Sequence, residues 1–175
     1  MSTLNQESLV IIKALFVEAE AKGILLWLES GWAIDARLKR ITREHEDIDI
    51  AFPYHQEPEY IGILKNLGFG TFEKMDYGFL MRKGQLLIDS EPCFKQDQNY
   101  VFPNFPPGSC PLEKEGELDG FPLRCISWEA MYVEFLGYMQ EVPSAQWRPK
   151  DFVSLEMIKQ HLTASQMQDL QLFGR

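Results

Sequence analysis

The sequence has little of what marks secreted, membrane or zinc-binding proteins. Its cysteines are an odd number without a Cys-x-x-Cys spacing (Cys93, Cys110 and Cys125), which argues against a disulfide framework or zinc site and fits a reducing compartment. The polar start MSTLNQES lacks the apolar region of a signal peptide, and no apolar run approaches the roughly 20 residues of a membrane span. We therefore expect a cytoplasmic protein that does not associate with a membrane.

Basic residues are also scarce, since 17 Lys and Arg stand against 26 Asp and Glu, giving a formal charge of −9. Such a surface repels a nucleic acid backbone and attracts cations, so a basic small molecule is a more suitable partner than nucleic acid. Repeats and low-complexity tracts are absent from the sequence. A chain of 175 residues, 45% of them hydrophobic, is long enough for one domain with a proper core.

Hydrophobic periodicity predicts an α/β (α+β) protein with a mixed sheet flanked by helices. Expected helices cover residues 9–19, 32–40, 57–67, 127–141, 149–162 and a short segment from 163. Expected strands cover residues 24–29, 47–52, 70–76, 77–82 and 85–91, and a further hairpin covers 117–126. Residues 92–111, rich in Pro and Asn, predict a long ordered loop. The expected division is a core of residues 1–125 and a small helical bundle over residues 126–175.

The stretch LLWLESGWAIDARLKRITREHEDIDIAF, residues 25–52, suggests phosphate chemistry. Ser30 and Gly31 break the chain between a strand and a helix, where the first helical N–H groups can bind an anion. Asp47 and Asp49 alternate with isoleucines, so on a strand they share one face, with Cα atoms roughly 6.6 Å apart. Paired carboxylates suit Mg²⁺ shared with substrate phosphates; the alternative is a half-exposed strand with solvated acids.

A third carboxylate, Asp89, follows a run of three apolar residues in a strand that one hairpin can bring beside the first. A carboxylate embedded there is costly unless it is paired or metal-bound, and it can accept a proton from an attacking hydroxyl. Arg43 and Lys150 are candidates to contact a triphosphate, although a solvated cation is the alternative for each. His45 is interpreted as a surface residue or as support for Asp47.

These residues carry a family resemblance. Ser-Gly-Trp-Ala-Ile-Asp at 30–35 and Thr-Arg-Glu-His-Glu-Asp-Ile-Asp at 42–49 resemble the signature of small antibiotic nucleotidyltransferases in the DNA polymerase β superfamily, and most closely the aminoglycoside 2''-nucleotidyltransferases. The resemblance continues through Asp-Tyr-Gly-Phe-Leu at 76–80, Gly-Ser-Cys-Pro at 108–111 and Ser-Trp-Glu-Ala at 127–130. It covers nearly the whole chain and is weakest over the last helices.

The resemblance implies a polymerase β-like nucleotidyltransferase core and a C-terminal helical region that closes the substrate cleft. It implies transfer of AMP from MgATP to a hydroxyl of an aminoglycoside antibiotic, as in antibiotic resistance, with release of pyrophosphate. The roles implied for individual residues are Mg²⁺ ligands (Asp47, Asp49 and Asp89), general base (Asp89), nucleotide phosphate binding (Ser30, Gly31 and Lys150) and acceptor binding (Tyr77, Glu91, Glu134 and Tyr138).

One departure from the family pattern is Ser30, preceded by Glu29, where the family has its first glycine. Unlike glycine, Ser30 carries a Cβ atom, which hinders the close approach of the backbone to a phosphate. Two alternatives stay open: a nucleotidyltransferase acting on a lincosamide or other small alcohol, and a noncatalytic antitoxin-like binding module of the same fold. A small chain whose helical part can close its own pocket is compatible with a monomer.

Overall fold

A mixed β-sheet forms the centre of the computed structural model, which describes residues 2–173. Among these residues the sheet has six strands in the order β1-β2-β5-β4-β3, and β6 pairs with β5. The strands are β1 Trp27–Leu28, β2 Ile48–Pro53, β3 Thr71–Lys74, β4 Phe79–Lys83, β5 Leu86–Gln96 and β6 Asn99–Val101; β7 Gly116–Leu118 and β8 Phe121–Leu123 form a separate hairpin. The helices are α1 Thr3–Ala21, α2 Ser30–Leu38, α3 Glu57–Asn66, α4 Trp128–Glu141, α5 Pro149–Lys159 and α6 Ala164–Leu170, with short 3₁₀ turns at Tyr54–Gln56 and Ser144–Gln146.

The pairing of β2 with β5 places the predicted acids side by side. The two strands run parallel, and Asp49 lies opposite Asp89 in the register. The hairpin predicted to join them is therefore wrong, because parallel neighbours need a longer crossover. Here the crossover runs through α3 and the antiparallel strands β3 and β4, and β4 then pairs with β5. Ile48, Ile50 and Ile88 are buried, which leaves the alternate positions of both strands for the acids.

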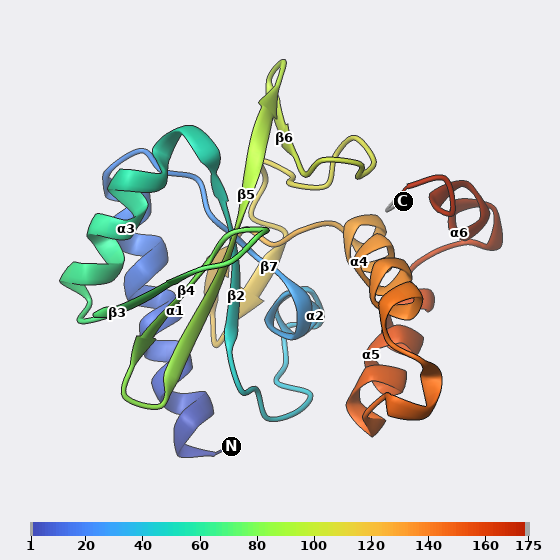
Figure 1. Cartoon of the computed structure of the whole chain (residues 1–175), viewed down its shortest axis with the longest axis horizontal. Coiled ribbons are helices and arrows are strands. Elements are labelled where there is room, and N and C mark those ends of the chain that lie inside the picture. Colours follow the sequence, from blue (N-terminus) through green and yellow to red (C-terminus); the bar gives the residue numbers. More distant parts are fainter. Residues whose placement is uncertain (1, 174–175) are drawn as a thin grey trace.

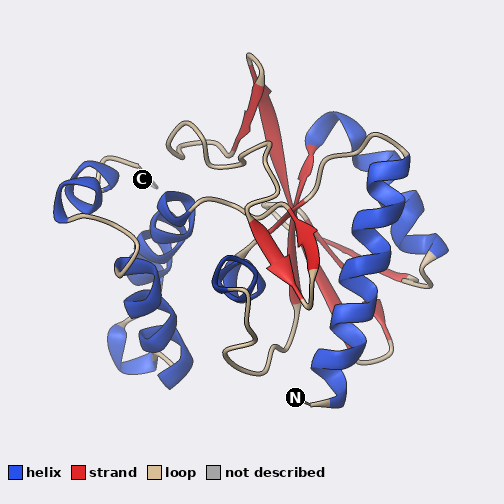
Figure 2. Cartoon of the chain, turned by 180° about the vertical axis from the view of Figure 1, so that it is seen from behind, coloured by secondary structure: helices blue, strands red, loops and turns tan. Residues whose placement is uncertain are grey.

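The helices lie in two groups around the sheet (Figure 1). Helices α1 and α3 lie together on one side, while α2 lies on the other, with α4 and α5 beyond it. Figure 2 shows the same arrangement from behind, with α1 running along the sheet. The buried residues of α1 recur at three- and four-residue steps, as predicted, and include Leu9, Ile12, Leu15, Phe16 and Ala19. The second group of helices borders the acids of β2 and β5.

Several boundaries differ from those predicted, and those nearest the acids of the sheet are as follows. Only Trp27 and Leu28 of the strand predicted over 24–29 are paired in the sheet, and α2 begins at Ser30 instead of residue 32. Where a loop was predicted from residue 92, β5 continues to Gln96 and turns back into β6. Pro92 is tolerated because β4 stops pairing at Ser90 and β6 starts at Phe94, so one edge of β5 is free where the proline lacks an N–H.

The C-terminal helices begin where their capping residues predict. The Ser127 hydroxyl accepts a hydrogen bond from the Ala130 N–H at 3.1 Å, Pro149 is the first residue of α5, and Thr163 and Gln166 form a reciprocal capping box before α6. None of the helices in the described part of the chain combines the length and apolarity needed to cross a bilayer.

Candidate active site

Two adjoining cavities, each of about 240 Å³, open between the sheet and the second helix group. They share Ser30, Asp49 and Glu134, so they are parts of one cleft, and together they reach the size of small-molecule sites. Every residue predicted to belong to the site lines this cleft. The first cavity adds Gly31, Arg43, Asp47, Tyr138 and Lys150; the second adds Tyr77, Asp89 and Glu91.

Asp47, Asp49 and Asp89 form the sheet side of the cleft. Asp47 immediately precedes β2, while Asp49 and Asp89 lie opposite each other on β2 and β5. Burial raises the pKa of Asp49 well above its usual value, and the charges of Asp47 and Asp89 raise it further. Burial also raises the pKa of Asp89, although hydrogen bonds to this carboxylate partly oppose the shift. The acids thus repel one another, and the positive charges of Arg43 and Lys150 offset this repulsion at Asp49 only in part.

The phenol of Tyr77 binds the Asp89 carboxylate. Its hydroxyl donates to Asp89 Oδ2 at 2.8 Å, whereas Oδ1 is buried and has no hydrogen-bond partner among the described residues. Tyr77 lies in a turn closed by the Met75 N–H, which donates to the Gly78 carbonyl oxygen at 3.0 Å. A Cβ on Gly78 would overlap the Ser90 carbonyl oxygen. Glycine is therefore required for the turn to approach β5 and place Tyr77 on Asp89.

The Ser30-Gly31 turn begins α2; Ser30 lines both cavities and Gly31 lines the first. Ser30 has a left-handed backbone with φ 50°, a conformation that costs a non-glycine residue roughly 1–2 kcal/mol. A Cβ on Gly31 would overlap the guanidinium of Arg43 and the ring of His45. Gly31 therefore allows Arg43 to pack against the turn predicted to bind phosphate.

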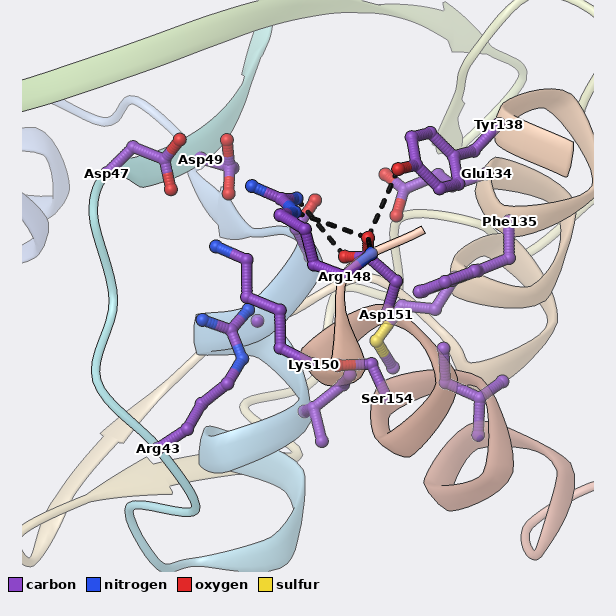
Figure 3. Close-up of a pocket in the computed structure, with 15 residues that line it drawn as sticks. Arg43, Asp47, Asp49, Glu134, Phe135, Tyr138, Arg148, Lys150, Asp151 and Ser154 are labelled. Carbon is purple, nitrogen blue, oxygen red and sulfur yellow. Dashed lines mark hydrogen bonds and ion pairs between the residues drawn. The ribbon is translucent and has the colours of Figure 1, made fainter. Parts of the chain in front are cut away.

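Basic side chains from two distant parts of the chain face the aspartates (Figure 3). Arg43 comes from the loop before β2, and Arg148 and Lys150 come from the start of α5. Lys150 Nζ lies 2.8 Å from Glu46 Oε2, and Arg148 Nη2 lies 3.1 Å from Asp151 Oδ1. The sequence had indicated Arg43 and Lys150 as phosphate contacts; it gave no sign that Arg148 also lines the cavity.

A buried polar network fixes the loop that carries Arg43 and Asp47. His45 Nε2 and Asp35 Oδ2 lie 2.7 Å apart, and both side chains are buried. The Asn5 amide donates to the Arg43 carbonyl oxygen at 2.9 Å and its oxygen accepts from the His45 N–H, also at 2.9 Å. The Trp32 ring stacks on His45 with 4.2 Å between centroids. The interpretation of His45 as a surface residue is therefore wrong, and its burial fits the supporting role instead.

The second cavity has a wall of carboxylates. Glu29 at the end of β1, Glu91 on β5 and Glu134 on α4 line it together. Burial raises the pKa of Glu29 and Glu134 well above the usual value, and mutual repulsion adds to the effect. Burial, with the charge of Asp89, raises the pKa of Glu91 to about 7. The sequence marks Glu29 as the residue before Ser30, where the chain departs from the family pattern, but it does not show that this glutamate is buried in the cleft, because a glutamate at a strand end is ordinarily solvated.

The carboxylates of the cleft fit a Mg²⁺ ion that is shared with a substrate. As they stand, the described residues include no group of three or more His, Cys, Asp or Glu side chains arranged to hold a metal ion. Mg²⁺ is commonly held by one or two carboxylates plus substrate phosphates, so Asp47 and Asp49 with a bound triphosphate meet that need. The unpartnered Asp89 Oδ1 and the raised pKa of Asp49 are also what a carboxylate set lacking its cation would show.

Comparisons with known proteins agree with this geometry. Residues 11–146 match the family model for aminoglycoside-2''-adenylyltransferase. A 2''-aminoglycoside nucleotidyltransferase from Escherichia coli is 38% identical over 95% of this chain and 94% of its own, and one from Klebsiella pneumoniae is equally similar. A lincosamide resistance protein from Staphylococcus haemolyticus is 25% identical over 78% of this chain and 88% of its own.

Among solved structures, the crystal structure of ANT(2'')-Ia in complex with adenylyl-2''-tobramycin superposes with a TM-score of 0.91 at 38% identity, covering 94% of this chain and 95% of that one. The lincomycin-bound lincosamide adenylyltransferase LnuA has a TM-score of 0.61 at 21% identity, covering 88% and 95%, and so shares the fold. The predicted nucleotidyltransferase fold is confirmed. The chain belongs to the aminoglycoside-2''-adenylyltransferase family.

Proposed function

We propose that this protein transfers AMP from MgATP to a hydroxyl of an aminoglycoside, releasing pyrophosphate and inactivating an antibiotic. One observation carries the proposal: the cleft has a wall of basic side chains, the aspartates Asp47 and Asp49, and a wall of carboxylates. The basic wall suits a triphosphate, and the carboxylate wall suits a polycationic acceptor. The relatives named for 2''-aminoglycoside transfer support the same acceptor class.

In the proposed reaction the acceptor hydroxyl attacks the α-phosphorus of ATP in line. A bond forms between the acceptor oxygen and the α-phosphorus, and the bond to the bridging oxygen breaks, so that pyrophosphate leaves with that electron pair. Asp89 takes the hydroxyl proton, since its raised pKa makes it a stronger base than an ordinary aspartate. Tyr77 holds one oxygen of Asp89 and thereby fixes the direction from which the other can act.

The other residues position the two substrates. Ser30 and Gly31 present backbone N–H groups to the phosphates, while Arg43 and Lys150 neutralise their charge. Lys150 must exchange its pairing with Glu46 for a phosphate oxygen, which is a small cost because Glu46 is largely exposed. Tyr77, Glu91, Glu134 and Tyr138 hold the acceptor.

Asp47 and Asp49 are the residues that would hold Mg²⁺, and the ion would supply charge neutralisation and Lewis acid polarisation of the phosphoryl group. That Asp89 is a third ligand stays a prediction. The division into a core of residues 1–125 and a closing helical region of residues 126–175 belongs to the same proposal. It is supported by the residues of α4 and α5 that line the first cavity.

Pyrophosphate release with MgATP tests the proposal, measured across a panel of aminoglycosides and with lincomycin. We expect release with aminoglycosides and little with lincomycin, which carries fewer cationic groups. Release with lincomycin alone would favour the lincosamide alternative. No release with any acceptor would favour a noncatalytic binding module, although a module without catalysis has no need of Asp47, Asp49 and Asp89 together.

A further inference from the structure

Glu29 has properties that the proposed mechanism does not use. Its side chain is 5% exposed, its Oε1 has no hydrogen-bond partner among the described residues, and it lines the second cavity. A buried carboxylate oxygen without a partner is costly. The fold keeps it in place, since the Glu29 N–H donates to the Asp49 carbonyl oxygen at 3.0 Å and its own carbonyl accepts from the Ala33 N–H at 3.1 Å.

The position of Glu29 extends the row of acids across the sheet. In the register of β1, β2 and β5, Leu28 lies opposite Ile50, which lies opposite Ser90. One step along the strands, toward the cleft, Glu29 lies beside Asp49, and Asp49 lies opposite Asp89. Three glutamates from different elements therefore line one cavity: Glu29 directly after β1, Glu91 on β5 and Glu134 on α4.

None of these three glutamates forms an ion pair or accepts a side-chain hydrogen bond within residues 2–173. The basic side chains of the cleft lie in the other cavity, where Lys150 pairs with Glu46 and Arg148 pairs with Asp151. The second cavity has a volume of about 240 Å³, several times the roughly 30 Å³ share of one water molecule. A polyatomic cation that brings its own hydrogen-bond donors fits a cavity of this size and lining.

We propose that Glu29 is a specificity-determining residue that, with Glu91 and Glu134, binds an ammonium group of the acceptor close to the hydroxyl that reacts. This inference rests on the proposed function and adds to it a residue and a selection rule. An acceptor with an amine at this place is favoured over one with a hydroxyl there, because the neutral group leaves the carboxylates unpaired. Glu29 takes no part in proton transfer or nucleotide binding in this assignment.

Titration calorimetry with tobramycin, at low and moderate ionic strength and without nucleotide, tests the inference on the wild type and Glu29→Gln. The amide keeps the shape but cannot carry the negative charge that pairs with an ammonium group, so the dissociation constant for tobramycin should rise about 10- to 100-fold, with a weaker dependence on salt. In turnover, KM for tobramycin should rise while kcat and KM for ATP stay near wild type.

Glu59→Gln is the matched control, because Glu59 is an exposed glutamate of α3, on the far side of the sheet. It changes the net charge by the same amount and should leave tobramycin affinity unchanged. Thermal unfolding of each variant establishes that it is folded. Equal affinity and equal salt dependence in wild type and Glu29→Gln would overturn the inference alone and make Glu29 a structural acid. Failure of the wild type to bind tobramycin would overturn the proposed function and the inference together.

Discussion

Replacing Glu91 by glutamine should stabilise the folded protein, and the gain should grow with pH. Glu91 lies in a cavity with other carboxylates and no cationic partner among the described residues. Its pKa is raised from 4.5 to about 7 by burial and by the charge of Asp89. The folded state therefore holds the proton more tightly than the unfolded state does between these two values, and stability must fall as pH rises through this window.

The size of the effect follows from that shift. One pKa unit corresponds to about 1.4 kcal/mol, so ionised Glu91 costs the fold on the order of 3 kcal/mol above pH 7. The cost disappears below the unfolded pKa of 4.5, where the carboxyl is protonated in both states. Glutamine cannot ionise and avoids the cost at every pH. The advantage of Glu91→Gln should thus be near zero at pH 4 and about 3 kcal/mol at pH 8.

Urea unfolding at several pH values between 4 and 8, in a buffer without Mg²⁺, measures this directly. Glu59→Gln serves again as the exposed control; because Glu59 lies in the first turn of α3, this variant should lose at most about 1 kcal/mol at pH 8, which is opposite in sign to the gain expected for Glu91→Gln. A gain of the same size at pH 4 and pH 8 would refute the electrostatic reasoning and point to packing instead. A loss of stability at pH 8 would show that ionised Glu91 has a favourable partner in the folded state.

Three other substitutions test separate parts of the cleft. Asp89→Asn should leave MgATP binding intact and lower kcat by about 10²- to 10⁴-fold, and an unchanged pH–rate profile in single-turnover assays would argue against the base role. Ser30→Gly should raise the free energy of unfolding in urea by up to about 1 kcal/mol, because it relieves a left-handed serine at φ 50°; a loss of stability would show that the hydroxyl matters more than the backbone. Gly78→Ala should push the turn off β5 and separate Tyr77 from Asp89, lowering kcat about 100-fold with a small change in melting temperature, and wild-type turnover would contradict that account.

The pattern of the sequence predicted the acids of the sheet well, because their physics is local. Alternation with buried isoleucines is enough to place Asp47 and Asp49 on one face of a strand. Asp89 was also predicted to lie beside them, but through a single hairpin connection. The strands β2 and β5 are instead parallel, and the crossover that joins them runs through α3, β3 and β4. Strand order is a property of the whole chain, which a local pattern does not contain.

The residues that sequence reasoning missed owe their roles to distant neighbours. His45 is buried because Asp35 and Asn5 provide its polar partners from two helices. The sequence marks Glu29 only as the residue before Ser30, and its place in one cavity with Glu134 of α4 depends on how the helices pack against the sheet. Burial of a polar side chain is set by tertiary packing, so residues of this kind are found only once the fold is known.

The transfer of the α-phosphate of ATP to an aminoglycoside is the central claim, and isotopic labelling tests it most directly. Wild type and Asp47→Asn are incubated with Mg²⁺, tobramycin and ATP that carries radioactive phosphorus at either the α or the γ position. The account predicts that the wild type moves the α label, but never the γ label, into tobramycin, and that Asp47→Asn moves neither. Transfer of the γ label, retention of both labels in ATP by the wild type, or full transfer by Asp47→Asn would contradict it.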